Sequence, residues 1–179
     1  MFNQNLERYL KSFGKQVMNR SKAGLQKAGK GGALEQSITY RVVKTNEGYD
    51  VQFMMNYYGQ FVDKGVSGKI IKQQYVNWKG ENTNSPGKGF TNKMPPPAPL
   101  EKWIKKKGLK GRDKKTGRYI SHKSLAFLIG AKIKREGIKS ISFFQKPLGL
   151  AMRTFNTQMK IAIAKDIEDT MSGINFKID

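Results

Sequence analysis

The stretch Asn56-Tyr-Tyr-Gly-Gln-Phe-Val-Asp-Lys-Gly65 follows two strand-like segments and precedes a long basic segment with little apolar periodicity. Its apolar residues Tyr57, Tyr58, Phe61 and Val62 recur at i, i+1, i+4 and i+5, which puts them on one face of a short helix. Gly65 stands where that helix should end. The spacing predicts one aromatic helical turn at which the chain leaves its sheet, with Tyr57, Tyr58 and Phe61 as anchors.

The residues before this turn predict a helix followed by a hairpin. From Phe2 to Ala28 the apolar side chains approximate a 3.6-residue stripe, although two glycines weaken the helix by roughly 1 kcal/mol each relative to alanine and allow a bend. Residues 34–44 and 49–55 alternate in the strand manner, and residues 45–48 have turn composition. A hairpin alone is marginal in water, so the helix is expected to pack on it.

Three more helices are predicted after the turn. A short helix from Pro99 to Lys107 follows a proline-rich segment, with Leu100, Trp103 and Ile104 on one side. Ser121 or Ser124 can cap a second helix that runs to about Glu136, and its inward residues are expected to be Leu125, Leu128, Ile129 and Ile133. A last helix from Pro147 to about Met171 carries the apolar residues Leu150, Met152, Phe155, Met159, Ile161, Ile163 and Ile167. Residues 174–178 alternate and are expected to add a terminal strand.

Together these elements predict an α+β fold, in which long N- and C-terminal helices pack on a small antiparallel sheet and a basic helical insertion interrupts the chain. The expected organisation is a frame of residues 1–65, an insertion subdomain of residues 66–140, and residues 141–179 completing the frame. The 179 residues are enough for one domain with a modest core and a subdomain.

Composition narrows the classes of function. Cysteine is absent, which excludes disulfides and thiol nucleophiles, and no run of about 20 apolar residues predicts a membrane span. The N-terminus lacks a basic start followed by an apolar block, so no signal peptide is predicted. The single histidine, His122, is expected at a helix start and cannot by itself build a hydrolytic triad or a metal site. No cofactor, metal or catalytic residue is therefore predicted, and the chain is not expected to be an enzyme.

The strongest physical signal is positive charge. The net charge is +21, and residues 67–140 hold 19 Lys/Arg against 4 Asp/Glu, or +15 of that total. Such an imbalance calls for an acidic partner, either the phosphates of DNA or an acidic protein face. The ten candidate contact residues are Lys102, Lys105, Lys106, Lys107, Lys110, Arg112, Lys114, Lys115, Arg118 and Lys123.

Weaker candidates have plainer explanations. Asp166, Glu168 and Asp169 form the densest acidic cluster and could hold a hydrolytic metal, but a solvated or inter-subunit helix face is the favoured interpretation. The loops at residues 87–89 and 108–112 combine glycine with basic residues, but they lack the Gly-Lys-Ser/Thr ending of a phosphate-binding loop. Four aromatic side chains could stack on single-stranded bases, although a small core explains the last of them better: Tyr75, Trp78, Phe90 and Trp103.

Three segments resemble the neck and tail-completion (head–tail joining) proteins of tailed bacteriophages. Tyr57-Tyr-Gly-Gln-Phe-Val-Asp-Lys-Gly65 is similar to that family's "tyrosine, small residue, x, aromatic, Val, acid, x, Gly" signature. Met94-Pro-Pro-Pro-Ala-Pro-Leu-Glu-Lys-Trp-Ile104 resembles a pattern of its longer members. Ser142-Phe-Phe-Gln-Lys-Pro-Leu-Gly-Leu-Ala151 is similar to the family's "Pro-Phe, x, x, Pro-Ala" entry to the final helix, without the first proline and with Gly149 and Leu150 between the later Pro and Ala.

The resemblance implies a structural virion protein that forms a homo-oligomeric ring at the head–tail junction, made in the host cytoplasm and located in the neck or tail. Its implied partners are portal, adaptor or tail proteins, with double-stranded DNA in the channel and no membrane. The residues Phe143, Phe144 and Pro147 join Tyr57, Tyr58 and Phe61 as expected frame anchors.

For the basic residues a protein partner is favoured over DNA, because a strongly cationic lumen would retard the passage of DNA. The alternative is a nucleic-acid-binding protein that contacts phosphates through the insertion, and a nuclease ranks third.

Overall fold

The computed structural model describes residues 4–87, 89 and 93–172, and divides the chain into two compact units. The first unit comprises residues up to Gly59, residues 76–81 and residues from Ser142 onward. The second comprises residues 60–75 and 82–141. These bounds differ from the expected ones in three places, because residues 60–65 and Ile141 belong to the second unit and residues 76–81 to the first.

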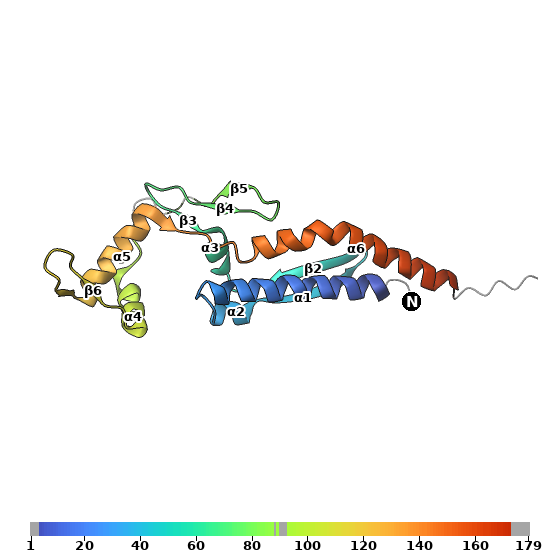
Figure 1. The fold of residues 1–179 in the computed structure, drawn as a ribbon, viewed down its shortest axis with the longest axis horizontal. Coiled ribbons are helices and arrows are strands. Elements are labelled where there is room, and N and C mark those ends of the chain that lie inside the picture. The colour runs from blue at the N-terminus through green and yellow to red at the C-terminus, as the bar shows by residue number, and fades with distance from the viewer. Residues whose placement is uncertain (1–3, 88, 90–92, 173–179) are drawn as a thin grey trace, which may run out of the picture. The chain divides into compact units, whose positions relative to one another are not determined.

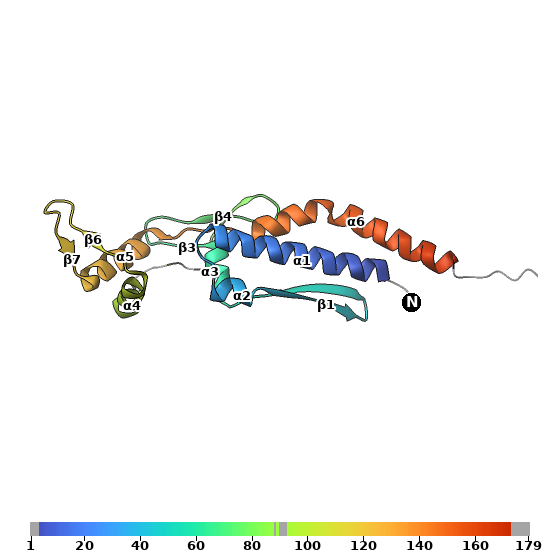
Figure 2. The same cartoon turned by 60° about the horizontal axis from the view of Figure 1, so that its bottom comes forward.

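The first unit is built on two long helices, as the sequence predicts. α1 (Gln4–Lys27) runs along α6 (Gln145–Ser172), and the antiparallel hairpin of β1 (Thr39–Thr45) and β2 (Gly48–Met54) also packs on α1 (Figures 1 and 2). The hairpin register pairs Thr39 with Met54 and Thr45 with Gly48, so the turn lies where Gly48 allows a positive φ. An α+β fold with long terminal helices is therefore confirmed. The expected terminal strand at residues 174–178 lies outside the described residues.

One predicted element of this unit is wrong. Residues 33–37 form a short helix, α2 (Ala33–Ser37), where the alternation predicted the beginning of a strand. Leu34 is buried in it, and Glu35 accepts a hydrogen bond from the side chain of Gln26. A single helical turn buries one apolar side chain as well as a strand does, and so short a run does not distinguish the two periods.

The core of the first unit is aromatic. Phe13 and Val17 of α1 and Ala151 of α6 are buried together, and the half-buried Phe53 and Phe155 pack against them. The ring centroids of Phe13 and Phe155 lie 4.8 Å apart and those of Phe13 and Phe53 6.5 Å apart, both in edge-on geometry. Helices and hairpin thus share one core to which each contributes a face.

α6 buries less of its apolar content than the sequence predicts. Ala151 and Ala162 are buried, as is the carboxylate of Asp166. Four residues that were expected in the core stripe are exposed instead: Leu150, Ile161, Ile163 and Ile167. Apolar residues in this helix occupy more than one face, so the helix can turn only part of them toward α1.

The second unit holds the remaining short elements. α3 (Gly59–Lys64) leads into β3 (Val66–Ser67), which pairs antiparallel with β8 (Gly137–Ile138). β4 (Gln74–Val76) and β5 (Asn82–Asn84) form a second small hairpin, whose tip, residues 76–81, belongs to the first unit. α4 (Pro97–Lys107) packs on α5 (His122–Glu136), and β6 (Gly111–Arg112) pairs with β7 (Tyr119–Ile120) in the loop that joins these two helices.

The sequence predicted the positions of α4 and α5 in the chain, but not which of their side chains are buried. Ile104 and Ala126 are fully buried, and Gly130 of α5 lies against Met94 and Leu100. Trp103 and Leu128, both expected inside, are exposed. The Ser121 side chain caps α5 by accepting the N–H of Ser124, as predicted. The small residues Ala126 and Gly130 let α4 and α5 approach closely, and the larger side chains of Trp103 and Leu128 therefore stay exposed to solvent.

The two glycines of α1 have different roles, which predicts opposite effects of alanine. A Cβ at Gly14 would lie 2.3 Å from Cδ2 of Tyr40, so the Tyr40 ring packs directly on the α1 backbone there. A Cβ at Gly24 would meet Phe143 at 3.6 Å, an ordinary contact. We expect Gly24→Ala to raise the free energy of unfolding by about 0.5–1 kcal/mol through helix propensity and Gly14→Ala to lower it by about 1–3 kcal/mol through overpacking.

Urea unfolding of the two single variants measures this difference on one helix. Each variant is the control for the other, because both substitutions gain the same intrinsic helix propensity and differ only in the space available for the added Cβ. Stabilisation by Gly14→Ala would contradict the contact with Tyr40.

Candidate interaction surfaces

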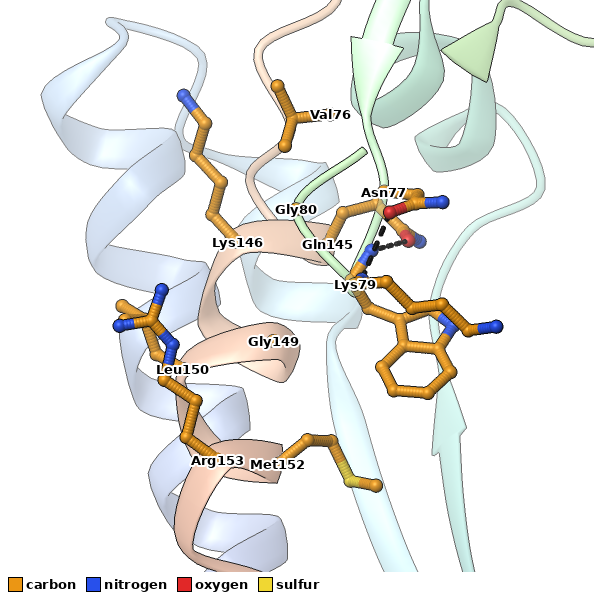
Figure 3. Close-up of a pocket in the computed structure, with 11 residues that line it drawn as sticks. Val76, Asn77, Lys79, Gly80, Gln145, Lys146, Gly149, Leu150, Met152 and Arg153 are labelled. Carbon is orange, nitrogen blue, oxygen red and sulfur yellow. Dashed lines mark hydrogen bonds between the residues drawn. The ribbon is translucent and has the colours of Figure 1, made fainter. Parts of the chain in front are cut away.

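A pocket of about 440 Å³ opens on the first unit, between the tip of the β4–β5 hairpin and the beginning of α6 (Figure 3). Two close approaches build it. A Cβ at Gly149 would lie 2.2 Å from the carbonyl oxygen of Trp78, so only glycine lets the hairpin tip touch the helix. The Trp78 N–H donates to Oε1 of Gln145 over 3.1 Å. The pocket wall is therefore fixed to α6 by one close backbone approach and by one hydrogen bond from the Trp78 backbone to the Gln145 side chain.

The hairpin tip is also ordered internally. Oδ1 of Asn77 accepts the N–H groups of Lys79 at 3.0 Å and Glu81 at 2.9 Å, and the Asn77 side chain donates to the Glu81 carboxylate at 2.9 Å. This is the side-chain turn geometry for which asparagine is favoured in loops. The tip residues consequently form a defined wall of the pocket.

The lining of the pocket combines apolar side chains with positive charge. Its residues are Val76, Asn77, Trp78, Lys79, Gly80, Gln145, Lys146, Gly149, Leu150, Met152 and Arg153. The Lys79 ammonium lies 5.5 Å from the centre of the Trp78 ring, and Lys146 and Arg153 project from α6 (Figure 3). Trp, Met and Arg are enriched at protein interfaces, and three cations without a lining carboxylate favour an anionic occupant.

The acidic cluster at the far end of α6 is partly structural. The Asp166 carboxylate is buried and accepts the N–H groups of Asn5 at 2.8 Å and Leu6 at 3.0 Å, which caps the first turn of α1. Asp169 accepts from the Asn5 side chain at 2.7 Å. Burial opposes the charged form, but these hydrogen bonds outweigh it and hold the pKa of Asp166 below its ordinary value.

Loss of this cap predicts a pH-dependent loss of stability. Because the folded-state pKa of Asp166 is lowered, its contribution is complete above the unfolded-state pKa and is lost as the pH falls below about 4 and through the folded-state pKa. We expect Asp166→Asn to lower the melting temperature at neutral pH by roughly 3–6 °C and to have a smaller effect in acid.

Melting curves across the acidic range measure the effect, and Asp50→Asn serves as the control because Asp50 is an exposed aspartate of β2. An equal loss for the two variants at neutral pH, or a loss that does not shrink in acid, would show that Asp166 is not a cap.

The ten predicted basic contact residues all have exposed side chains in the second unit. They lie on α4, on the β6–β7 hairpin and its loop, and at the start of α5. Lys105 forms an ion pair of 2.8 Å with Glu101. Arg112 stacks 4.5 Å from the centre of the Tyr119 ring and donates to its hydroxyl at 2.6 Å. The structure thus places all ten of these charges in one unit, with exposed side chains.

The hairpin loop that carries three of these cations has a defined turn. Oδ1 of Asp113 accepts the N–H groups of Lys115 at 2.9 Å and Thr116 at 2.8 Å, and these bonds lower the pKa of its carboxyl. The loop therefore presents Lys114, Lys115 and Arg118 from an ordered support.

The six expected anchors divide into two groups. Phe143 is 3% exposed, Pro147 is buried, and Phe144 packs 5.3 Å from the Phe53 ring in the first unit. Tyr57, however, is 79% exposed, and Tyr58 and Phe61 are exposed as well. Helix α3 begins only at Gly59, so the two tyrosines precede it and do not share its face. The sequence predicted that these three aromatic residues anchor the frame, and their exposure corrects that prediction.

The remaining sequence candidates do not gather into a site. His122 begins α5 and is exposed, and Phe90 lies outside the described residues. Lys64 lies 5.9 Å from the centre of the Tyr75 ring. Among the described residues, no group of three His, Asp or Glu side chains could hold a metal ion, and no helix is long and apolar enough to cross a membrane.

Sequence reasoning missed the pocket. Its signal was Gly149 in the first turns of a predicted helix, where glycine is unfavourable unless a backbone approaches closely. The chain matches no protein-family model, no curated protein and no solved structure.

Proposed function

We propose that this chain is a structural virion protein, which forms a ring at the head–tail junction of a tailed bacteriophage and joins a portal or adaptor to the tail. The observation that carries the proposal is the resemblance of three segments to that family. The first covers α3, the second leads into α4, and the third leads into α6. On this proposal the protein catalyses no reaction, and the second unit is a basic insertion that reaches neighbouring subunits.

The exposed side chains support an assembling protein. Apolar residues on α6 and the aromatic residues before α3 face solvent in a single chain. Large exposed apolar patches on a folded protein usually mark interaction sites. Repetition of such contacts around a ring allows each of them to be weak.

Deletion of the gene from the phage that carries it tests the proposal. We expect filled heads and free tails to accumulate without joining, and mass spectrometry of complete virions to detect the protein. Complementation in trans should restore joined particles. Joined, infectious particles that lack the protein would contradict the proposal.

A second candidate is nucleic-acid binding by the basic unit. The observation that favours it is ten exposed cations close in sequence to exposed Trp103, Tyr119 and Phe127. A phosphate-binding surface loses affinity steeply with salt, with a slope that falls by about 1 for each lost contact.

Electrophoretic shift of duplex DNA across a salt series distinguishes the two candidates. Lys114→Gln and Arg118→Gln remove hairpin charges, and Lys15→Gln on α1 is the control of equal charge change. Tight, salt-sensitive binding by the isolated chain that only the hairpin variants weaken would favour the DNA-binding candidate.

A further inference from the structure

Two complementary surfaces lie near opposite ends of α6. One is the pocket beside Trp78, with the cations Lys79, Lys146 and Arg153. We call the other the acidic end, and it consists of exposed Ile167, Glu168 and Met171. Ile167 is 51% and Met171 63% exposed, so the acidic end offers apolar side chains beside a carboxylate. The pocket offers apolar lining beside cations.

Neither surface is satisfied within its own chain. Among the described residues, the four ion pairs involve none of Lys79, Lys146, Arg153 and Glu168. In contrast to Glu168, the neighbouring Asp166 and Asp169 bind Asn5. Both surfaces therefore keep charge available for another molecule.

The helix itself prevents the two surfaces from meeting in one molecule. Arg153 and Glu168 are separated by 15 residues of continuous α6, which corresponds to about 22 Å along the helix axis. A helix cannot fold back on itself, so the acidic end can reach only the pocket of a different copy.

Other acidic groups of the chain fit the pocket less well. Glu101 and Glu136 are paired with lysine or arginine, and Asp63 is buried. Glu47 and Asp50 are exposed at the β1–β2 turn, but no large exposed apolar side chain lies at residues 45–51. Glu168 is an exposed carboxylate with two such side chains within three residues, Ile167 and Met171.

We propose that the acidic end of one copy docks into the Trp78 pocket of a second copy, with Ile167 or Met171 on the apolar lining and Glu168 among the three cations. This deepens the ring proposal by naming the surfaces through which copies meet. The contact is heterologous, because each copy uses two different surfaces, so successive copies add head to tail and close into a ring or extend as a filament. The contact between copies rests on charge and apolar surface, so it can be tested on the purified protein whether or not the protein is part of a virion.

Charge reversal at either surface tests the contact through the oligomeric state, measured by light scattering after size exclusion. We expect the wild-type chain to form assemblies larger than a dimer at high concentration and low salt. The pocket variant Lys146→Glu with Arg153→Glu, and the end variant Glu168→Lys, should each weaken association roughly 10- to 100-fold. Lys15→Glu, a single charge reversal at an exposed residue of α1, should leave association unchanged.

Mixing the two defective variants gives the decisive result. The pocket variant keeps an intact acidic end, and the end variant keeps an intact pocket, so the mixture should pair the two chains although neither variant associates alone. The reversed pocket and the reversed end also carry opposite charges, so further copies should add through that contact more weakly. Combining Arg153→Glu with Glu168→Lys in one chain should restore part of the assembly. Melting curves of every variant verify that each is folded.

Several outcomes would overturn the inference. They are a wild-type chain that stays monomeric at every concentration, reversal variants that assemble as the wild type does, and mixed variants that do not pair. Loss of binding to a single-stranded oligonucleotide by the pocket variant, with assembly unchanged, would assign the pocket to nucleic acid. None of these results decides whether the protein is needed to join heads to tails, so the two proposals can fail separately.

Discussion

Gly137→Ala is expected to unfold the second unit. Gly137 begins β8 with a φ of 81°, and a Cβ there would lie 2.0 Å from the carbonyl oxygen of Val66 and 2.6 Å from the backbone nitrogen of Gly68. Both atoms belong to the backbone, so no side-chain rotation can relieve the overlap. With the cost of a positive φ added, we expect the free energy of unfolding to fall by about 4 kcal/mol or more.

Fluorescence can follow each unit separately, because Trp78 belongs to the first and Trp103 to the second. In a Trp78→Phe background, the urea transition of Trp103 should move to much lower urea or disappear with Gly137→Ala. The control is Gly117→Ala, since Gly117 has a φ of 69° but no atom within 4 Å of a Cβ. It should cost only about 1–2 kcal/mol. Equal effects of the two substitutions would contradict the β3–β8 contact.

Phe13→Ala is expected to have the largest effect in the first unit. The Phe13 ring contacts Tyr9, Phe53 and Phe155, and the side chain is buried. Removing it leaves a cavity where α1, α6 and the hairpin meet, and such substitutions cost about 3–5 kcal/mol. The Trp78 transition, measured in a Trp103→Phe background, should shift to lower urea by a corresponding amount.

Phe127→Ala is the matched control for Phe13→Ala. Phe127 is 57% exposed on α5, so the same atoms are removed with little lost burial, and we expect a change within about 1 kcal/mol. If Phe13→Ala were as mild as Phe127→Ala, the aromatic cluster could not be the core of the first unit.

Periodicity predicted the long elements well and the short ones poorly. The predicted helices at residues 2–28 and 147–171 correspond to α1 and α6, because many apolar positions define a period over several turns. Residues 33–37 and the two-residue strands β3 and β8 are too short to show a period. Their structure follows from partners that are distant in the sequence.

The same limit applies to the candidate surfaces. The ten basic residues could be named from composition alone, and all are exposed. The Trp78 pocket could not, since it joins residues 76–80 to residues 145–153 across a long separation in the chain. Gly149 indicated a close approach to the helix, but a single glycine in a helix does not identify which segment of backbone approaches it.

The sequence by itself determined the charge, the long helices, the hairpin and the cap at Ser121, because these depend on residue type and on neighbours within a few positions. Only the tertiary structure decided which apolar face of α6 is buried and which aromatic residues are exposed. It also decided that Gly14 accommodates Tyr40 and that Asp166 caps α1. These outcomes depend on packing between segments far apart in the chain, and local periodicity contains no information about that packing.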